Sequence, residues 1–365
     1  MIRILHTGDL HLDTAFRGLP SEQARERRSE QRTLLERMRA LVEERQIDVV
    51  LIAGDLFDSD SVYYETTHML ADVLGRMSAK VFIAPGNHDP YSEFSPYTGV
   101  RWPENVHLFQ SDYFERVELP ELGAVVYGTA FTSKYRDDAP LERFKADYDD
   151  NLVRLMVMHG DVTTGRSRYG AINPADLGRT GMDYVALGHI HQGGEVQRQG
   201  ETSYAYCGCP EGRGFDETGD KGVIVAEVER GKVKAEFVPL CGRRYEEVTV
   251  HVDGKEAGLA LLQALPQNTA SDIYRFRLVG ERSGNRPDMT VLEKKLKNRF
   301  YAIQVIDETV PVQDLWERED EDSLTGLFLR QMRDRMNHAS PEEQPILERA
   351  VRYGLAALEG REEPR

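Results

Sequence analysis

Apolar residues in the first hundred positions follow two spacings, those of buried strands and those of helices. Residues 2–6, 48–53 and 81–84 are short and strongly apolar, which is typical of parallel strands that are buried on both faces. Between them, apolar positions recur at helical spacing over residues 21–45 and about 62–77. The order strand, helix, strand, helix, strand predicts a layered α/β fold.

Beyond residue 105 the apolar runs become shorter. We predict strands at 106–109, 123–127, 152–158, 184–187, 203–207, 222–228 and 232–238. The last two flank Arg230-Gly231-Lys232, a sequence that is typical of a hairpin. A long loop at 162–179, rich in Gly, Thr, Ser and Arg, separates two of the buried strands. These strands predict a second sheet.

A new pattern begins near residue 243. Strands and helices alternate there, at 245–252, 254–265, 273–279, 288–299 and 301–307. A run of acidic residues follows, consisting of Glu317, Glu319, Asp320, Glu321 and Asp322. Such a run is typical of a solvated linker. We therefore divide the chain into a large α/β domain at 1–242, a small α+β domain at 243–312, and an acidic linker with C-terminal helices at 313–365.

Two C-terminal helices, at about 322–338 and 342–358, carry apolar stripes at helical spacing. The stripes contain Leu324, Leu327, Phe328, Met332 and Met336 in the first helix, and Ile346, Leu347, Ala350, Val351, Tyr353 and Leu358 in the second. They either fold back on the α+β domain or form an exposed face that binds a partner's coiled coil. We favour binding to a partner.

The composition is that of a globular protein with more than one domain. At 365 residues the chain is long for one core, and its 40% hydrophobic residues include no run that could span a bilayer. Residues 1–5 lead directly into a strand and lack the features of a signal peptide. The three cysteines, Cys207, Cys209 and Cys241, are too few for a disulfide framework, so we expect a cytoplasmic protein with no membrane association.

The net charge of −16 restricts how the chain can bind nucleic acid. It argues against binding through a broad basic surface. It does not exclude nucleic acid as a substrate, because a bound pair of metal ions can supply the positive charge that a phosphodiester needs.

Five predicted strands end at side chains that commonly bind metals. These are Asp9 and His11, Asp55, Asn87 with His88, His159, and His189 with His191. Open α/β sheets bind ligands at the carboxyl ends of their strands. Mixed imidazole and carboxylate ligands suit Mn, Fe or Zn better than Mg or Ca alone. Two such ions, ~4 Å apart, can hold a phosphate and activate water, which predicts hydrolysis of a phosphoester.

Each of these pieces also has an ordinary explanation. A single histidine at a strand end is more often a surface or core residue, and Gly-Asp before an apolar residue is commonly a turn or a helix cap. Five such coincidences, all at strand ends, are far less common than one. The hypothesis of a metal site is therefore preferred.

The side chains lie in five short motifs. The motifs are Gly8-Asp9-Leu10-His11, Gly54-Asp55-Leu56-Phe57-Asp58, Gly86-Asn87-His88-Asp89, His159-Gly160 and Gly188-His189-Ile190-His191. Together they resemble the complete signature of the calcineurin-like metallophosphoesterases, over residues 1 to about 240. The resemblance implies a four-layer α-β-β-α sandwich with two divalent metal ions.

The resemblance also implies a role for each motif residue. One ion would be held by Asp9, His11, Asp55 and His191, and the other by Asp55, Asn87, His159 and His189. His88 would not bind metal, but would contact the phosphate and act as general acid toward the leaving oxygen. Together with Asp55 and Asn87, it forms the expected catalytic set.

Within this superfamily, residues 5–13 resemble the SbcD-type DNA repair exonucleases, particularly their YhaO-like branch. Two further segments, 206–210 and 221–223, support this resemblance. It implies a Mn-dependent DNA exo- or endonuclease with a capping domain at 243–312. The C-terminal helices would bind an SbcC-type, SMC-like ATPase. A homodimer through helices of the catalytic domain rests on the resemblance alone.

The chain departs from the SbcD pattern at two places. The usual first motif is Ser-Asp-Trp-His-Leu-Gly, where this chain has Gly8 to Asp13. Cys209 stands where Ser is common, and we expect neither Cys207 nor Cys209 to bind metal. These differences leave the phosphoesterase chemistry intact and keep substrates other than DNA open.

Two alternatives to a DNA nuclease remain. One is a metallophosphodiesterase that acts on nucleotides or other small phosphoesters, and the other is a non-catalytic scaffold. Candidate DNA contacts are Arg166, Arg168, Arg179 and Arg213. Solubility is the commoner explanation for surface arginines. The additional domain and helices favour the nuclease, and the intact ligand set disfavours the scaffold.

Overall fold

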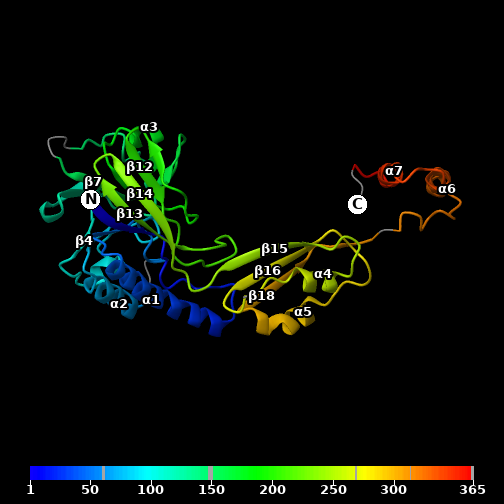
Figure 1. The fold of residues 1–365 in the computed structure, drawn as a ribbon, viewed down its shortest axis with the longest axis horizontal. Coiled ribbons are helices and arrows are strands. Elements are labelled where there is room, and N and C mark those ends of the chain that lie inside the picture. The colour runs from blue at the N-terminus through cyan, green and yellow to red at the C-terminus, as the bar shows by residue number, and fades with distance from the viewer. Residues whose placement is uncertain (60–61, 147–150, 268, 313, 363–365) are drawn as a thin grey trace. The chain divides into compact units, whose positions relative to one another are not determined.

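The computed structural model describes residues 1–59, 62–146, 151–267, 269–312 and 314–362 (Figure 1). The chain divides into two compact units. The first consists of Met1–Val248, Gln267–Arg275 and Lys295–Gln304, and the second of Thr249–Pro266, Phe276–Lys294 and Val305–Arg365. All of the predicted metal ligands belong to the first unit.

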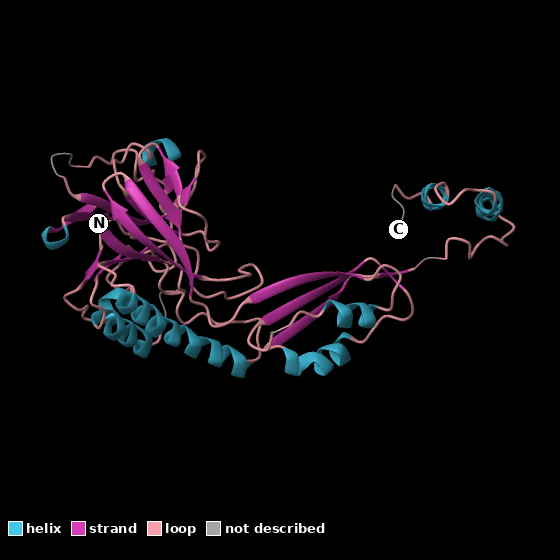
Figure 2. Cartoon of the chain, in the orientation of Figure 1, coloured by secondary structure: helices cyan, strands magenta, loops and turns pink. Residues whose placement is uncertain are grey.

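Two six-stranded sheets form the centre of the first unit (Figure 2). The first sheet has the order β14-β13-β1-β2-β3-β4. Its strands are Lys232–Pro239 (β14), Gly222–Glu229 (β13), Ile2–Thr7 (β1), Val49–Ile52 (β2), Lys80–Ile83 (β3) and Val106–Leu108 (β4). β1 to β4 run parallel, whereas β13 and β14 form an antiparallel hairpin beside β1.

The second sheet has the order β11-β12-β10-β7-β6-β5. Its strands are Gln197–Gln199 (β11), Thr202–Tyr206 (β12), Tyr184–Gly188 (β10), Val153–His159 (β7), Ala124–Gly128 (β6) and Glu115–Leu119 (β5). The four central strands are parallel, and an antiparallel strand closes each edge. The sequence predicts the four central strands but not the two edge strands, because these are short and polar.

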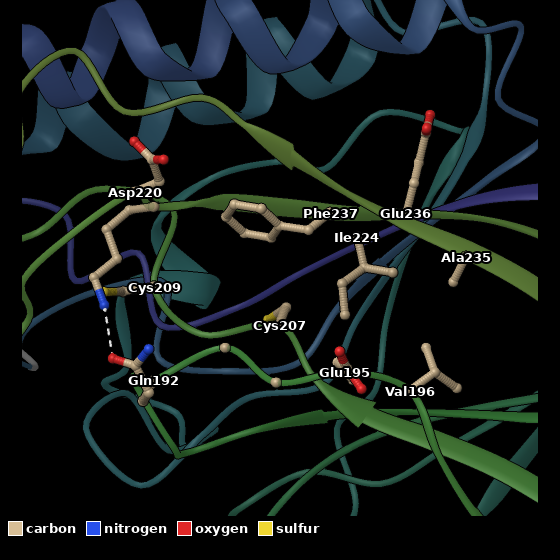
Figure 3. A pocket seen from close by; sticks show the side chains of 13 residues that line it. Gln192, Glu195, Val196, Cys207, Cys209, Asp220, Ile224, Ala235, Glu236 and Phe237 are labelled. Atoms are coloured by element: carbon tan, nitrogen blue, oxygen red, sulfur yellow. Dashed lines mark hydrogen bonds between the residues drawn. The ribbon is translucent and has the colours of Figure 1, made fainter.

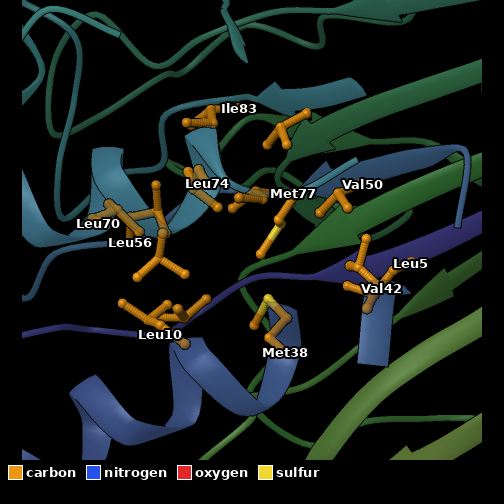
Figure 4. Close-up of a cluster of buried hydrophobic side chains, with 14 of the residues drawn as sticks. Leu5, Leu10, Met38, Val42, Val50, Leu56, Leu70, Leu74, Met77 and Ile83 are labelled. Carbon is orange, nitrogen blue, oxygen red and sulfur yellow. The ribbon is translucent and has the colours of Figure 1, made fainter. Parts of the chain in front are cut away.

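Helices α1 (Ser21–Glu44) and α2 (Tyr64–Gly75) cover one face of the first sheet. Figure 4 shows the cluster of buried apolar side chains between these helices and the sheet. In it, Met38 and Val42 of α1 lie against Leu5 and Val50 of the sheet. Fully burying one such side chain contributes about 1.5–3 kcal/mol. The helical spacing of the apolar residues in α1 therefore determines which face packs on the sheet.

Side chains of the first sheet alternate between two cores because successive residues of a strand point to opposite faces. Leu5 of β1 faces the helices, whereas its neighbour Ile4 faces the second sheet. Val50 and Leu51 of β2 divide in the same way. This alternation explains why the strands read as continuous apolar runs in the sequence.

His6 joins the two sheets within the second core. It is fully buried; its Nε2 donates to the carbonyl of Leu187 at 3.1 Å, so its Nδ1 accepts from the hydroxyl of Tyr184 at 3.0 Å. Because these bonds tie β1 to β10 near their carboxyl ends, the ends of the two sheets meet along one edge.

The outer face of the second sheet is covered mainly by loops. Apolar side chains such as Leu141, Ile172 and Met182 pack there against Met156 of β7. The described residues on this face contain one helix, the four-residue α3 (Pro174–Leu177), and a short parallel pair, β8 (Asp161–Val162) with β9 (Ala171–Ile172). The α/β fold with mixed sheets is present, but its fourth layer is thinner than a helical layer.

Further along the chain, strands and helices alternate in the predicted order. The elements are β15 (Tyr245–His251), α4 (Ala257–Ala264), β16 (Ile273–Val279), β17 (Glu281–Arg282), α5 (Met289–Leu296), β18 (Ala302–Asp307) and β19 (Val310–Pro311). β15, β16 and β18 form a three-stranded sheet in the order β15-β16-β18, and β17 pairs with β19. Short 3-10 turns lie at Pro96–Gly99, Pro120–Leu122 and Lys297–Arg299.

The C-terminal helices α6 (Leu324–Asn337) and α7 (Gln344–Leu358) pack against each other. Leu329 and Val351 belong to this small core. Leu315, which precedes the acidic run, also packs there. Leu324, Ile346 and Tyr353 remain exposed. Each apolar stripe is therefore divided between a buried and an exposed part. In the described part of the chain, no helix is both long and apolar enough to cross a membrane.

Candidate metal centre

Three ligand-bearing loops follow β1, β2 and β3 at one edge of the first sheet. Because these strands are parallel neighbours, their carboxyl ends bring Asp9, Asp55 and Asn87 together. The loops after β1 and β2 are also hydrogen-bonded to each other. The amide of Asp9 donates to the carbonyl of Gly54, and that of His11 donates to the backbone carbonyl of Asp55, both at 2.9 Å. The positions of these side chains are thus fixed by the backbone.

The second sheet contributes His159, the last residue of β7, and His189, the residue after β10. Nδ1 of His159 donates to the carbonyl of Ala53 at 2.9 Å. The amide of His189 donates to both carboxylate oxygens of Asp9 at 3.1 Å. These bonds cross from one sheet to the other, so the predicted ligands of both sheets form a single site.

The backbone at this site is strained. Asp9, His11, Asp55 and His189 have positive φ angles of 51°, 43°, 49° and 110°. Non-glycine residues rarely adopt this region, and where they do, the strain commonly lies at functional sites. Gly188 also lies so close to Ala53 that a Cβ atom would come within 1.9 Å of its carbonyl oxygen. The glycine of this motif is therefore required by close approach of the two sheets.

Asp9, His11, Asp55 and His191 form the first group of candidate ligands. Each offers one atom, and these atoms lie within 4.8 Å of one another. Both carboxylates are buried, and burial together with the charge of Asp55 raises the pKa of Asp9 well above its usual value. Burial also disfavours the charge on Asp55, but the neighbouring His159, His11 and His88 hold its pKa below the usual value. A divalent cation would offset the cost of burying two facing acids.

Asn87, His159 and His189 form the second group, around the amide oxygen of Asn87. This oxygen is 2.9 Å from Nε2 of His159 and 3.1 Å from Nδ1 of His189. Because Nδ1 of His159 donates to Ala53, and burial lowers the pKa of His159, its Nε2 carries a lone pair. Two acceptors therefore face each other at hydrogen-bond distance, an arrangement that a cation between them would stabilise.

Asp55 lies between the two groups. Its Oδ2 is 3.7 Å from Nε2 of His11 and 3.5 Å from Nε2 of His159. Burial lowers the pKa of both His11 and His189 to about 4, so their rings are neutral near pH 7 and can bind metal. The donor set fits a dinuclear site with Asp55 shared by both ions.

Comparison with known proteins identifies the family of the chain. The sequence model of the calcineurin-like phosphoesterases matches residues 2–193. The chain belongs to this family. It is 30% identical over 274 residues to the uncharacterized metallophosphoesterase YhaO of Bacillus subtilis, covering 72% of this chain and 66% of that protein. It is 27% identical over 278 residues to SbcD of the Bacillus subtilis SbcCD nuclease, covering 63% of this chain and 67% of that protein.

The chain thus spans about two thirds of the length of these relatives. Among solved structures, GAP50, the anchor in the inner membrane complex of Plasmodium, is 12% identical with a TM-score of 0.40, covering 65% of this chain and 84% of that one. The family membership that the five motifs predict is confirmed, as is the likeness to YhaO and to SbcD.

His88 lies at the exposed side of this phosphoesterase site. Its amide donates to Oδ1 of Asp55 at 2.9 Å, and its ring centre is 4.8 Å from that of His11. It also forms a second, more exposed set of possible ligand atoms with His11 and Asp58. The imidazole therefore lies beside the deeper ligands rather than among them.

A charged network surrounds the histidines of the first group. Oε1 of Glu217 accepts from Nδ1 of His191 at 2.8 Å and from Nη2 of Arg213 at 2.5 Å. Nη1 of Arg213 is 3.5 Å from Oδ1 of Asp58, which in turn is 3.2 Å from Nδ1 of His11. Burial opposes the charge of Glu217, but these partners hold its pKa far below the usual value. A carboxylate of this kind orients a metal-binding histidine and raises its basicity.

Glu217 was not predicted from the sequence, and Arg213 was predicted to contact DNA. Arg213 was a candidate DNA contact, whereas the structure places its guanidinium half-buried between Glu217 and Asp58. The available signal was the spacing of four residues between Arg213 and Glu217 in a glycine-rich segment. That spacing gives no indication that the imidazole of His191 contacts both side chains.

The other three candidate DNA contacts lie on the exposed loop between β7 and β10. Arg166, Arg168 and Arg179 are all exposed. Arg179 pairs with the carboxylate of Asp176, and Arg168 lies over the ring of Tyr135. Arg168 is thus the arginine of this loop that the structure places on an aromatic side chain.

A cavity of about 550 Å³ lies behind the loop that carries His191 (Figure 3). Cys207 and Cys209 line it, and the thiol of Cys209 donates to the carbonyl of His191 at 3.5 Å. Lys221 reaches the same carbonyl at 3.5 Å and Oε1 of Gln192 at 3.4 Å. Cys209 and Lys221 therefore support the backbone of the His191 loop.

Proposed function

We propose that this protein is a dinuclear metal-dependent phosphodiesterase that hydrolyses DNA. The observation that carries the phosphoesterase chemistry is the facing pair of acceptors, Nε2 of His159 and Oδ1 of Asn87, next to the buried carboxylate of Asp55. Membership of the calcineurin-like phosphoesterase family supports it. DNA is proposed as the substrate because one relative is named as part of a nuclease.

The residues have distinct roles in this proposal. Asp9, His11, Asp55 and His191 hold one ion, and Asp55, Asn87, His159 and His189 hold the other. When bound, the two ions, proposed to be Mn, polarise the phosphoryl oxygens and lower the pKa of water.

His88 acts from the exposed side of the site and donates a proton to the departing oxygen. Its position is fixed by the bond from its amide to Asp55. Substitution of His88 by Ala removes the proton donor and leaves the proposed ligands in place. We expect both ions to remain bound while most diesterase activity is lost.

The test of the substrate is hydrolysis of end-labelled single- and double-stranded DNA with added Mn, beside bis-p-nitrophenyl phosphate and a cyclic nucleotide. Degradation of DNA that disappears in Asp55→Ala supports the nuclease. Cleavage of the small diesters alone, also in the presence of an SbcC-type ATPase, would favour a small-molecule phosphodiesterase.

We further propose that α6 and α7 bind an SbcC-type, SMC-like ATPase through their exposed apolar side chains. Leu324, Ile346 and Tyr353 supply this face, while Leu329 and Val351 hold the helices together. Such a face can bind a helical partner.

The double substitution Leu324→Glu with Ile346→Glu tests this proposal because both side chains are exposed and the packing of the helices is kept. Loss of co-purification with the co-expressed ATPase is expected. Leu259→Glu, at an exposed leucine of α4, is the matched control. Equal binding by the double variant and the control would contradict the proposal.

A further inference from the structure

Aromatic rings form a row from the deepest part of the metal centre to the surface. The ring centre of His189 is 5.2 Å from that of His159 on one side and 4.9 Å from that of Tyr169 on the other. Tyr169 is followed by Tyr135 at 6.0 Å. Exposure increases along the row, from 2% for His159 to 38% for Tyr135. The row therefore connects the proposed ligands to the solvent.

The two tyrosines lie on different loops that are joined by backbone hydrogen bonds. Arg136 and Tyr169 form an isolated β-bridge. The backbone amide of Arg136 donates to the carbonyl of Arg168, and the amide of Gly170 donates to the carbonyl of Arg136, both at 2.8 Å. The loops thus hold the two rings in a fixed relation to each other and to His189.

Two cationic side chains lie near the ring at the exposed end of this row. The guanidinium carbon of Arg168 lies 3.8 Å from the ring centre of Tyr135, and Nζ of Lys134 lies 5.8 Å from it. The carboxylate of Asp137 is 3.9 Å from Nε of Arg168, and 64% of the Arg168 side chain is exposed. Two cations on one exposed aromatic ring stand out in a chain of net charge −16.

We propose that Tyr135 and Arg168 form a stacking platform for a nucleobase close to the scissile phosphate of single-stranded DNA. The proposal rests on the nuclease function proposed above and names how the substrate is held. Bases stack on aromatic rings and on guanidinium planes without regard to sequence. Stacking needs no broad basic surface, so it suits an acidic protein.

The span from His189 to Tyr135 corresponds to a few nucleotides of a stacked strand. Stacked bases rise ~3.4 Å per nucleotide. The two ring-to-ring steps from His189 to Tyr135 measure 4.9 and 6.0 Å. A strand whose phosphate lies at the metals can therefore place a base two or three nucleotides away on Tyr135.

The experiment removes the ring of Tyr135 from the protein and, separately, the stacked base from the substrate, and compares the effects of the two changes. Tyr135→Ala and Arg168→Ala are tested on a single-stranded oligonucleotide, and on the same oligonucleotide with abasic sites at the positions that are expected to reach Tyr135. Tyr135→Phe keeps the ring, and Phe237→Ala is a control at an exposed aromatic residue of β14. We expect KM on the normal strand to rise ~5- to 100-fold in the two alanine variants, with little change in kcat.

On the abasic strand, wild type and Tyr135→Ala are expected to have the same KM, and Tyr135→Phe is expected to resemble wild type on both strands. An unchanged KM on the normal strand, or an equal rise on both strands, would overturn the platform. The nuclease function would stand in either case, provided that Asp55→Ala abolishes cleavage.

A second measurement does not depend on turnover. Single-stranded DNA that contains 2-aminopurine is titrated with His88→Ala protein in Mn, since this variant keeps the proposed ligands. Stacking on Tyr135 is expected to quench the fluorescence, and the additional substitution Tyr135→Ala is expected to remove the quenching. Binding without quenching would reject the platform. Absence of binding, together with absence of DNA cleavage by the wild-type protein, would reject DNA as the substrate.

Discussion

The two sides of the metal centre are supported in different ways. On the first side, His191 contacts the carboxylate of Glu217 at 2.8 Å, and His11 lies 3.2 Å from that of Asp58. On the second side, His159 donates to a backbone carbonyl, and its ring lies 5.5 Å from that of Phe131. One side is therefore held by charges and the other by neutral and aromatic groups.

This difference predicts unequal binding of the two ions. Carboxylates behind an imidazole make it a stronger ligand, so the ion held by His11 and His191 should bind more tightly. Behind His159 stand the carbonyl of Ala53 and the ring of Phe131, neither of which carries a charge. The ion on this side should bind more weakly, but polarise a phosphate more strongly because less charge is donated to it.

The largest expected effect comes from the residue shared by both sides. Asp55→Ala removes the carboxylate that lies between His11 and His159. We therefore expect the affinity for both ions to fall and the activity to fall ~10³-fold or more. Metal content by mass spectrometry and initial rates test this. Asp72→Ala, at an exposed aspartate of α2, is the control. Retention of both ions at wild-type affinity would contradict the shared role.

Glu217→Gln separates the two sides. It keeps the size of the side chain and removes the charge behind His191, so affinity for one ion should fall ~10- to 100-fold while the other is unchanged. Calorimetric titration with Mn resolves the two steps. Glu195→Gln, at an exposed glutamate, is the control. An equal loss at both steps would show that the sides are not independently supported.

His6 provides a buried histidine outside either group, and burial lowers its pKa to about 3. The unfolded chain takes up this proton near pH 6.5, whereas the folded protein does not, so the free energy of unfolding should fall as the pH drops below 6.5. Between pH 7 and 5 the loss from this residue is about 2 kcal/mol. Urea unfolding with a chelator present measures it. In His6→Gln the dependence on pH should be flatter, and an identical dependence would contradict the assignment.

The smallest effect is expected at the aromatic side. Phe131→Leu keeps an apolar side chain next to His159 and should cost about 1–1.5 kcal/mol of stability. Metal affinity should change less than in Glu217→Gln, because the ring donates no hydrogen bond. A tenfold or larger loss of affinity would break the comparison and show that aromatic packing positions His159 as effectively as Glu217 positions His191.

The sequence predicted the parts of the site that depend on strand ends. Asp9, Asp55 and Asn87 follow three adjacent parallel strands, so their proximity was predictable from the apolar runs alone. The positive φ angles of Asp9 and Asp55 were not predictable, because hydrogen bonds between the loops bend the backbone there. The thin fourth layer was also missed, since loop residues such as Leu141 and Met182 cover the second sheet without helical spacing.

The sequence by itself determined the strands, the helices on the first sheet and the types of metal ligand, because these are encoded in local periodicity and in short motifs. The tertiary structure alone decided which residues stand behind the ligands. Glu217 meets His191, and Tyr135 meets Tyr169, across separate loops. No local pattern specifies such meetings, because they arise only when the packing of two sheets brings their loops to the same edge.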